Sequence, residues 1–141
     1  MLEVFITRIL GLDIGDKRIG VALSDPSGKL ASPLTIINRS HEMADLEAIT
    51  SIINKYDVKR VIVGLPRSMD GSLGKQAEKV EAFTRKLCNY TQVPVEFRDE
   101  RLTTVSARRL IRASRTRKAR KEAKDDAIAA ALILQGFLDE G

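Results

Sequence analysis

Residues 60–66, RVIVGLP, form a short apolar run rich in β-branched residues that ends at a glycine and a proline. A continuous apolar run is typical of a strand buried on both faces, because a half-buried strand alternates apolar and polar residues. Amphipathic patterns with helical spacing flank the run on both sides. It therefore predicts an α/β domain in which helices cover both faces of a sheet.

The remaining segments complete an order of β-β-β-α-β-α-β-α-α. Strands are predicted at residues 6–12, 18–24, 34–38, 60–66 and 94–97. Helices are predicted from a Ser40 cap to about residue 56, at 73–87, from Thr103 or Thr104 to about residue 113, and at 126–138. A three-strand meander followed by two crossover units indicates a mixed sheet. The length of 141 residues predicts one domain spanning 1–141.

Composition excludes several classes of protein. The longest apolar run, Ala127–Leu134, has eight residues, whereas a membrane-spanning helix needs about 20. Residues 1–8 lack the features of a secretory signal, so we expect a cytoplasmic protein without a membrane partner. With one cysteine and one histidine, the chain has too few residues for a thiolate zinc site or a hydrolase triad. Cys88 follows Leu87 on an apolar helical stripe and is expected to be a buried, unreactive thiol.

Positive charge is concentrated in one segment. Residues 105–124 carry nine lysines and arginines against Glu122 alone, within a chain of net charge +5. Such a dense block repels itself and is expected to be mobile, at about 112–124, unless a polyanion neutralises it. Six of the nine are arginines, which bind phosphate in a bidentate manner. Nucleic acid is therefore the expected partner, and a solvated linker is the alternative.

Three acidic positions are candidates for chemistry. Asp13 follows the first predicted strand, Glu100 follows the fifth, and the pair Asp125–Asp126 precedes the last helix. If the fourth and fifth strands run parallel to the first, their carboxyl ends share one sheet edge, where α/β folds place their sites. Three carboxylates there would repel unless they bound a divalent cation, and oxygen ligands suit Mg²⁺ or Mn²⁺. Helix capping is the alternative role for the aspartate pair.

Four blocks of the chain closely resemble the YqgF/RuvX family. They are ILGLDIGDKRIGVALSD (9–25), VIVGLPRSMDGSLGKQAEKV (61–80), FRDERLTT (97–104) and KDDAIAAALILQ (124–135). Members are described as Holliday junction resolvases and as pre-16S ribosomal RNA nucleases. The resemblance covers nearly the whole chain and implies a ribonuclease H-like fold, with a mixed five-stranded sheet of order 3-2-1-4-5 and helices on both faces.

The resemblance also implies roles for individual residues. Asp13, Glu100 and Asp126 correspond to catalytic, metal-binding carboxylates, with register favouring Asp126 over Asp125. Asp16 stands where the family frequently has threonine, and we interpret it as a turn residue. Gly15 and Gly20 permit tight backbone paths near Asp13. The expected nucleic-acid contacts are Lys17, Arg18, Arg101, Arg108, Arg112, Arg115, Arg117, Lys118, Arg120 and Lys121.

These features predict a Mg²⁺- or Mn²⁺-dependent nuclease that cleaves structured nucleic acid, with 5′-end processing of pre-16S ribosomal RNA in ribosome biogenesis favoured. A Holliday junction resolvase would use the same carboxylates, because positive charge recognises phosphate and does not distinguish the sugar. A third hypothesis is a non-catalytic module that binds RNA or the ribosome. Aromatic residues make up 4% of the chain, so recognition is expected to use shape and backbone rather than base stacking.

Overall fold

The structure, a computed structural model, describes residues 7–66, 73–100 and 118–140, with residues 118–125 described by their backbone alone. The strands are β1 (Arg8–Ile14), β2 (Arg18–Ser24), β3 (Ala31–Asn38), β4 (Val58–Leu65) and β5 (Val95–Asp99). The helices are α1 (Glu42–Lys55), α2 (Lys75–Tyr90) and α4 (Lys118–Glu140). No helix in the described ranges is long and apolar enough to cross a membrane.

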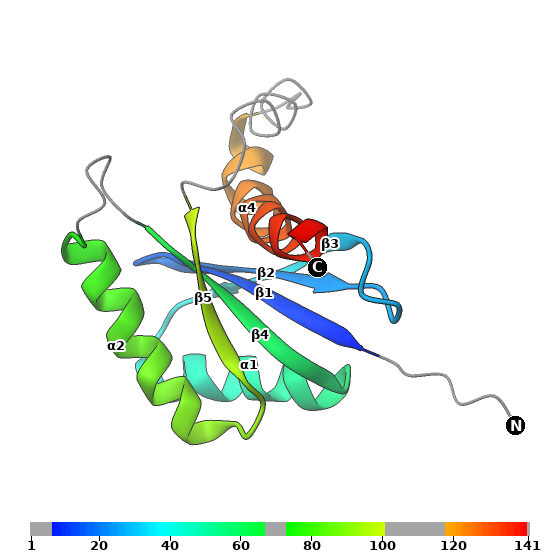
Figure 1. Cartoon of the computed structure of the whole chain (residues 1–141). Coiled ribbons are helices and arrows are strands. Elements are labelled where there is room, and N and C mark those ends of the chain that lie inside the picture. The colour runs from blue at the N-terminus through cyan, green and yellow to red at the C-terminus, as the bar shows by residue number, and fades with distance from the viewer. Residues whose placement is uncertain (1–6, 67–72, 101–117, 141) are drawn as a thin grey trace, which may run out of the picture.

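The strands form one sheet in the order β3-β2-β1-β4-β5. β2 runs antiparallel to both β1 and β3, while β4 is parallel to β1 and β5 is parallel to β4. Helices α1 and α2 cover one face of this sheet, and α4 lies across the other (Figure 1). The mixed sheet, its order and the helices on both faces are therefore confirmed.

The structure corrects the bounds of two elements near the candidate site. β1 continues through Asp13 to Ile14, because Asp13 pairs with Gly20 in the ladder to β2. The last helix begins at Lys118 rather than at residue 126. Lysine, arginine, alanine and glutamate are strong helix formers, and this propensity outweighs the charge repulsion that was expected to keep the basic segment mobile. Residues 118–124 of the expected mobile segment are thus helical in their backbone, while 112–117 and the predicted 103–113 helix lie outside the described residues.

Two smaller expectations were wrong. His41, not Ser40, is the N-cap of α1, and its Nδ1 accepts a hydrogen bond from the backbone nitrogen of Ala44 at 3.3 Å. Cys88 is exposed. It follows the buried Leu87 on α2, and one residue of an α-helix turns the side chain by about 100°, which carries the thiol to the solvent side.

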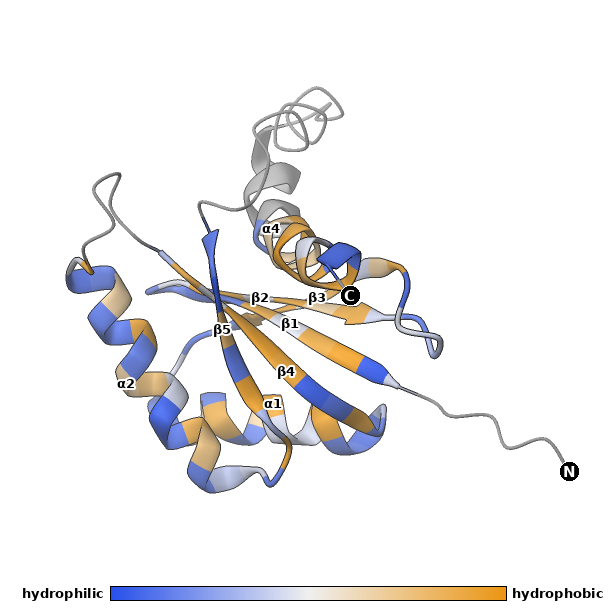
Figure 2. Cartoon of the chain, viewed as in Figure 1, coloured by the Kyte–Doolittle hydropathy of each residue, from blue (hydrophilic) through white to orange (hydrophobic). Residues whose placement is uncertain are grey.

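The two faces of the sheet are packed differently. Large aliphatic residues of α1 and α2 pack against one face and form the main core. On the other face, α4 presents buried alanines and aliphatic residues along one side, as its apolar colouring indicates (Figure 2). A Cβ built on Gly11 would lie 2.8 Å from Leu134 Cβ and 2.9 Å from the carbonyl oxygen of Ala130. Helix α4 therefore lies unusually low on the sheet, and small residues make that approach possible.

Candidate functional site

Asp13 lies on the face of the sheet that α4 covers. Two preceding residues of β1, Ile9 and Gly11, contact α4 on that face. Because strand side chains alternate between faces, Asp13 is directed to the same side, at the carboxyl end of the strand. Its side chain is partly buried. The β1 ladder therefore delivers this carboxylate to the space beneath the N-terminal half of α4.

Asp126 is brought to the neighbouring strand by a close backbone contact. A Cβ built on Gly20 would lie 1.8 Å from the carbonyl oxygen of Asp126 and 2.9 Å from the nitrogen of Ala127. Real Cβ atoms do not approach a carbonyl oxygen so closely, so only glycine fits at this position. Gly20 is the ladder partner of Asp13. Helix α4 thus places Asp126 directly beside the strand position of Asp13.

The Glu100 side chain lies over β4, which pairs with β1 on the side away from β2. A Cβ built on Gly64 would lie 2.9 Å from Glu100 Oε1 and 2.4 Å from Ile133 Cδ1. Leu12 of β1 is paired with Val63 of β4, so Gly64 lies alongside Asp13 in the parallel ladder. The Glu100 carboxylate therefore lies over the strand next to Asp13, on the face that α4 covers.

The Asp13 side chain, the Glu100 carboxylate and the backbone of Asp126 lie over three adjacent strands at one end of the sheet. They supply only oxygen ligands, the donor set that Mg²⁺ and Mn²⁺ prefer. Within residues 7–66, 73–100 and 126–140, no three Asp, Glu, His or Cys side chains are already gathered at metal-binding separations. Instead, Asp126 Oδ2 accepts a hydrogen bond from Arg18 Nε at 2.7 Å. Asp13, Glu100 and Asp126 are thus brought to one end of the sheet, with the Asp126 carboxylate held by an arginine.

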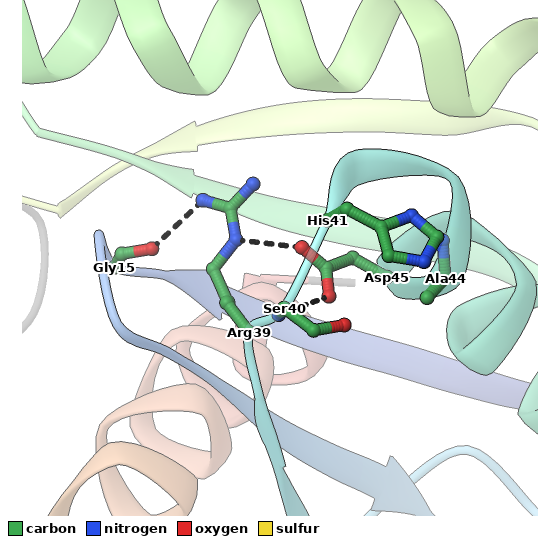
Figure 3. A network of polar contacts seen from close by, with 6 residues as sticks. All are labelled: Gly15, Arg39, Ser40, His41, Ala44 and Asp45. Carbon is green, nitrogen blue, oxygen red and sulfur yellow. Dashed lines mark hydrogen bonds and ion pairs between the residues drawn. The ribbon is translucent and has the colours of Figure 1, made fainter.

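The turn between β1 and β2 is anchored from outside the site by Arg39 (Figure 3). Its Nη1 donates to the carbonyl of Gly15 at 2.9 Å, and its Nε donates to Asp45 Oδ2 at 3.1 Å. The guanidinium also lies 4.8 Å from the centre of the Phe83 ring, a distance typical of a cation–π contact. Arg39 thus ties the turn that follows Asp13 to both α1 and α2.

The buried carboxylate in this network is Asp45, whose side chain is 3% exposed. Its second oxygen accepts from the backbone nitrogen of Ser40 at 3.1 Å, so both oxygens have partners. Sequence reasoning did not single out Arg39 or Asp45. The available signal was an aspartate beside Leu46 on the apolar stripe of the first helix, where a charge requires a partner.

The remaining predicted nucleic-acid contacts divide into three groups. Lys17 is exposed on the turn, and Asp16 Oδ1 lies 3.4 Å from Lys79 Nζ in an exposed ion pair, which fits a turn residue. Lys118, Arg120 and Lys121 lie on the first turns of α4, where the description covers the backbone alone. Outside the described residues lie Arg101, Arg108, Arg112, Arg115 and Arg117.

Known proteins of one family match almost the full chain, and it is the family that the sequence blocks resemble. A family model described as "RuvX: Holliday junction resolvase" matches residues 7–140. A protein of Moorella thermoacetica named "Putative pre-16S rRNA nuclease" is 53% identical over 133 residues, covering 94% of each chain. A protein of the same name from Thermoanaerobacter pseudethanolicus is 51% identical over 134 residues, covering 94% of this chain and 96% of the relative.

Solved structures agree on the fold. RuvC of Thermus thermophilus in complex with a Holliday junction superposes with a TM-score of 0.64 at 14% identity, covering 96% of both chains. The fowlpox virus resolvase superposes with a TM-score of 0.55 at 17% identity, covering 95% of this chain and 98% of the viral chain. These likenesses identify the ribonuclease H-like fold of the resolvases. The family model and the relatives of about half-identical sequence place the chain in the RuvX family.

Proposed function

We propose that this protein is a divalent-metal-dependent nuclease that processes the 5′ end of pre-16S ribosomal RNA in the cytoplasm during ribosome biogenesis. Asp13, Glu100 and Asp126 are the proposed metal ligands and catalytic residues. The proposed substrate rests on the relatives named for pre-16S ribosomal RNA. The proposed metal-dependent cleavage rests on the arrangement of the three acidic residues.

One observation carries the proposal: the strands on both sides of Asp13 have a glycine where another acidic residue needs room. Gly20 admits the backbone of Asp126, and Gly64 admits the carboxylate of Glu100. Neither glycine lies in a turn, because both are interior to strands, where glycine costs stability relative to alanine. Each of these two glycines therefore lowers the stability of its strand at a position that brings an acidic residue next to Asp13.

The donor set fits Mg²⁺ or Mn²⁺, since carboxylate oxygens on rigid elements suit hard divalent cations. When bound, such ions supply Lewis acidity that activates water and stabilises the oxygen leaving the phosphodiester. Asp13 provides a ligand fixed by the central strand, and Asp126 provides one fixed by α4. Glu100 closes the set from the end of β5, and each of the three contributes negative charge that holds the cations in place.

We assign substrate binding to lysine and arginine residues. Lys17 and Arg18 flank the turn that follows Asp13, and Lys118, Arg120 and Lys121 begin α4. Arg101, Arg108, Arg112, Arg115 and Arg117, which lie outside the described residues, complete the set of basic residues that we propose contact phosphates. Contacts of this kind set the register of a nucleic acid without identifying the sugar.

A Holliday junction resolvase is the second candidate, favoured by the description of the matching family model. It uses the same three carboxylates and differs only in the nucleic acid that it cuts. The two functions therefore separate by substrate preference and not by the effect of active-site substitutions.

The test uses the purified protein with labelled precursor 16S RNA, a four-way DNA junction and single-stranded controls, each in Mg²⁺, Mn²⁺ or EDTA. Asp13→Asn is expected to abolish metal-dependent cutting while leaving binding intact. Asp16→Asn is the matched control, because Asp16 lies three residues away in an exposed pair with Lys79, and it should cut normally. Preference for the junction would favour the resolvase. Binding without cutting in every lane would replace both candidates with a non-catalytic RNA- or ribosome-binding module.

A further inference from the structure

The side chain of Arg18 holds one of the proposed metal ligands. Its Nε donates to Asp126 Oδ2 at 2.7 Å, between residues 108 positions apart in the chain. Both side chains are partly exposed, by 37% for Arg18 and 30% for Asp126. Arg18 lies two residues before Gly20 on β2, so both are on the face that α4 covers. The pair therefore lies on the same face of the sheet as the candidate site.

A guanidinium and a divalent cation compete for the same carboxylate. Arginine stays protonated in proteins, so its positive charge cannot be removed when a metal ion approaches. An ion that binds Asp126 through Oδ2, or through both oxygens, would take the oxygen that now accepts from Arg18, and the two positive charges would repel at close range. Metal binding through Oδ2 therefore requires the guanidinium to move away from that oxygen.

A guanidinium that has left Asp126 is still placed to contact the substrate in the candidate site. Arg18 begins β2 directly after the exposed Lys17, and its backbone carbonyl accepts from the nitrogen of Gly15 at 2.9 Å. The backbone of Arg18 is thus held in place at the start of β2, and the guanidinium lies at the end of a long side chain. Guanidinium groups bind phosphate oxygens in a bidentate manner, and the phosphodiester to be cut must lie beside the metal.

We propose that Arg18 is an exchangeable counter-ion, which neutralises Asp126 before metal binds and contacts the substrate phosphate once metal has taken the carboxylate. This inference rests on the proposed function, because it requires Asp126 to be a metal ligand. It differs from a purely structural role, in which the ion pair fixes Asp126 in its ligating position. The two roles predict opposite changes in metal affinity when the guanidinium is removed.

The experiment measures Mn²⁺ binding to the substrate-free protein by electron paramagnetic resonance of the free ion. Arg18→Gln is expected to tighten Mn²⁺ binding by about two- to fivefold, the size expected for removing one competing charge pair. Lys17→Gln is the matched control, since it removes a neighbouring exposed charge without touching Asp126, and it should change the affinity less than about twofold. Unchanged or weaker Mn²⁺ binding in Arg18→Gln would overturn the proposal.

A second readout follows the other half of the exchange. Binding of the labelled precursor RNA is measured by stopped-flow fluorescence anisotropy in Mn²⁺ and in EDTA, within the time before the RNA is cut. The wild-type protein should bind this RNA more tightly in Mn²⁺, and Arg18→Gln should lose most of that gain. A full gain in Arg18→Gln would show that the guanidinium does not pass to phosphate.

Asp13→Asn separates failure of the inference from failure of the proposed function. If Asp13→Asn binds Mn²⁺ as tightly as the wild type, the ion does not occupy this site, and the proposed function and the role of Arg18 both fail. If Asp13→Asn loses Mn²⁺ while Arg18→Gln shows no tightening, the site stands and only the role of Arg18 is overturned. Thermal melting without metal verifies that each variant is folded.

Discussion

Gly20 lies in direct backbone contact with Asp126, so that a Cβ on this glycine would come within 1.8 Å of the Asp126 carbonyl oxygen. The contact joins the strand beside Asp13 to the helix that carries the third acidic residue. It also fixes the height of α4 above the sheet, together with the similar contact of Gly11 with Leu134. The position of one proposed ligand thus depends on the absence of a single methyl group.

Gly20→Ala is expected to destabilise the protein and to weaken the site together. The atoms that the new Cβ would meet belong to the backbone of α4 and cannot rotate away, so α4 must shift or the strand must deform. We expect a loss of about 3 kcal/mol in the free energy of unfolding, at the upper end of the range for overpacking. Urea denaturation measures this loss, and Mn²⁺ affinity should fall in the same variant.

Gly74→Ala is the control for this substitution. Gly74 is the N-cap of α2, with φ −87°, and a Cβ there would have no heavy atom within 4 Å. Its replacement should cost no more than about 1 kcal/mol, the usual effect at an N-cap. Equal losses in Gly20→Ala and Gly74→Ala would contradict the assigned contact between Gly20 and α4.

The β2–β3 loop gives a prediction about pH. Backbone hydrogen bonds from Leu30 and Lys29, at 2.8 Å each, and a hydrogen bond from the Ser27 hydroxyl hold the pKa of Asp25 well below its ordinary value of 3.8. A depressed pKa means that the stabilisation is complete above the unfolded pKa and is lost as the pH falls below it. Asp25→Asn should therefore lower the melting temperature by a few degrees at pH 7.

The difference between the two proteins should shrink as the pH is lowered from 5 to 2, because Asp25 of the unfolded wild-type chain takes up a proton in this range, which offsets the stabilisation of the charged native carboxylate. Circular dichroism melts at several pH values test this trend. Asp57→Asn is the comparison, since Asp57 pairs only loosely with Lys59 in an exposed contact of 3.1 Å. A gap between wild type and Asp25→Asn that stays constant across this range would contradict the assignment of the hydrogen bonds.

The element order and the candidate acids were predictable from sequence for a physical reason. Periodicity reports which faces are buried, and parallel strands must end at the same sheet edge, so Asp13 and Glu100 were expected together. Asp126 followed from register with the family. The resemblance supplied the sheet order, which the hydrogen-bonded ladders confirm.

The contacts that tune the site were not predictable in the same way. Gly20 was expected to serve the path of its own strand, whereas its contact is with α4, a helix from the far end of the sequence. The pairing of Arg18 with Asp126 has the same long-range origin. Periodicity describes one element at a time, so it contains no information on how low a distant helix lies over a sheet.

Arg39 gives the last prediction, which concerns the turn after Asp13. Arg39→Met keeps an apolar stem near Phe83 but removes the cation from Asp45, whose side chain is 3% exposed. An uncompensated buried carboxylate is expensive, so we expect a loss of about 3 kcal/mol in the free energy of unfolding. Lys86→Met is the matched control, because Lys86 pairs with Glu42 on the surface, and its loss should cost less than about 1 kcal/mol.

The same variant should also reveal whether the turn positions the site. Arg39 Nη1 holds the Gly15 carbonyl, and the backbone nitrogen of Arg39 donates to the carbonyl of Lys17 at 2.9 Å. Loss of the guanidinium leaves the second contact and removes the first, so the segment after Asp13 loosens without unfolding. Mn²⁺ affinity, measured where both proteins are fully folded, should therefore fall in Arg39→Met and stay unchanged in Lys86→Met. Unchanged affinity in Arg39→Met would restrict this arginine to stabilising the fold.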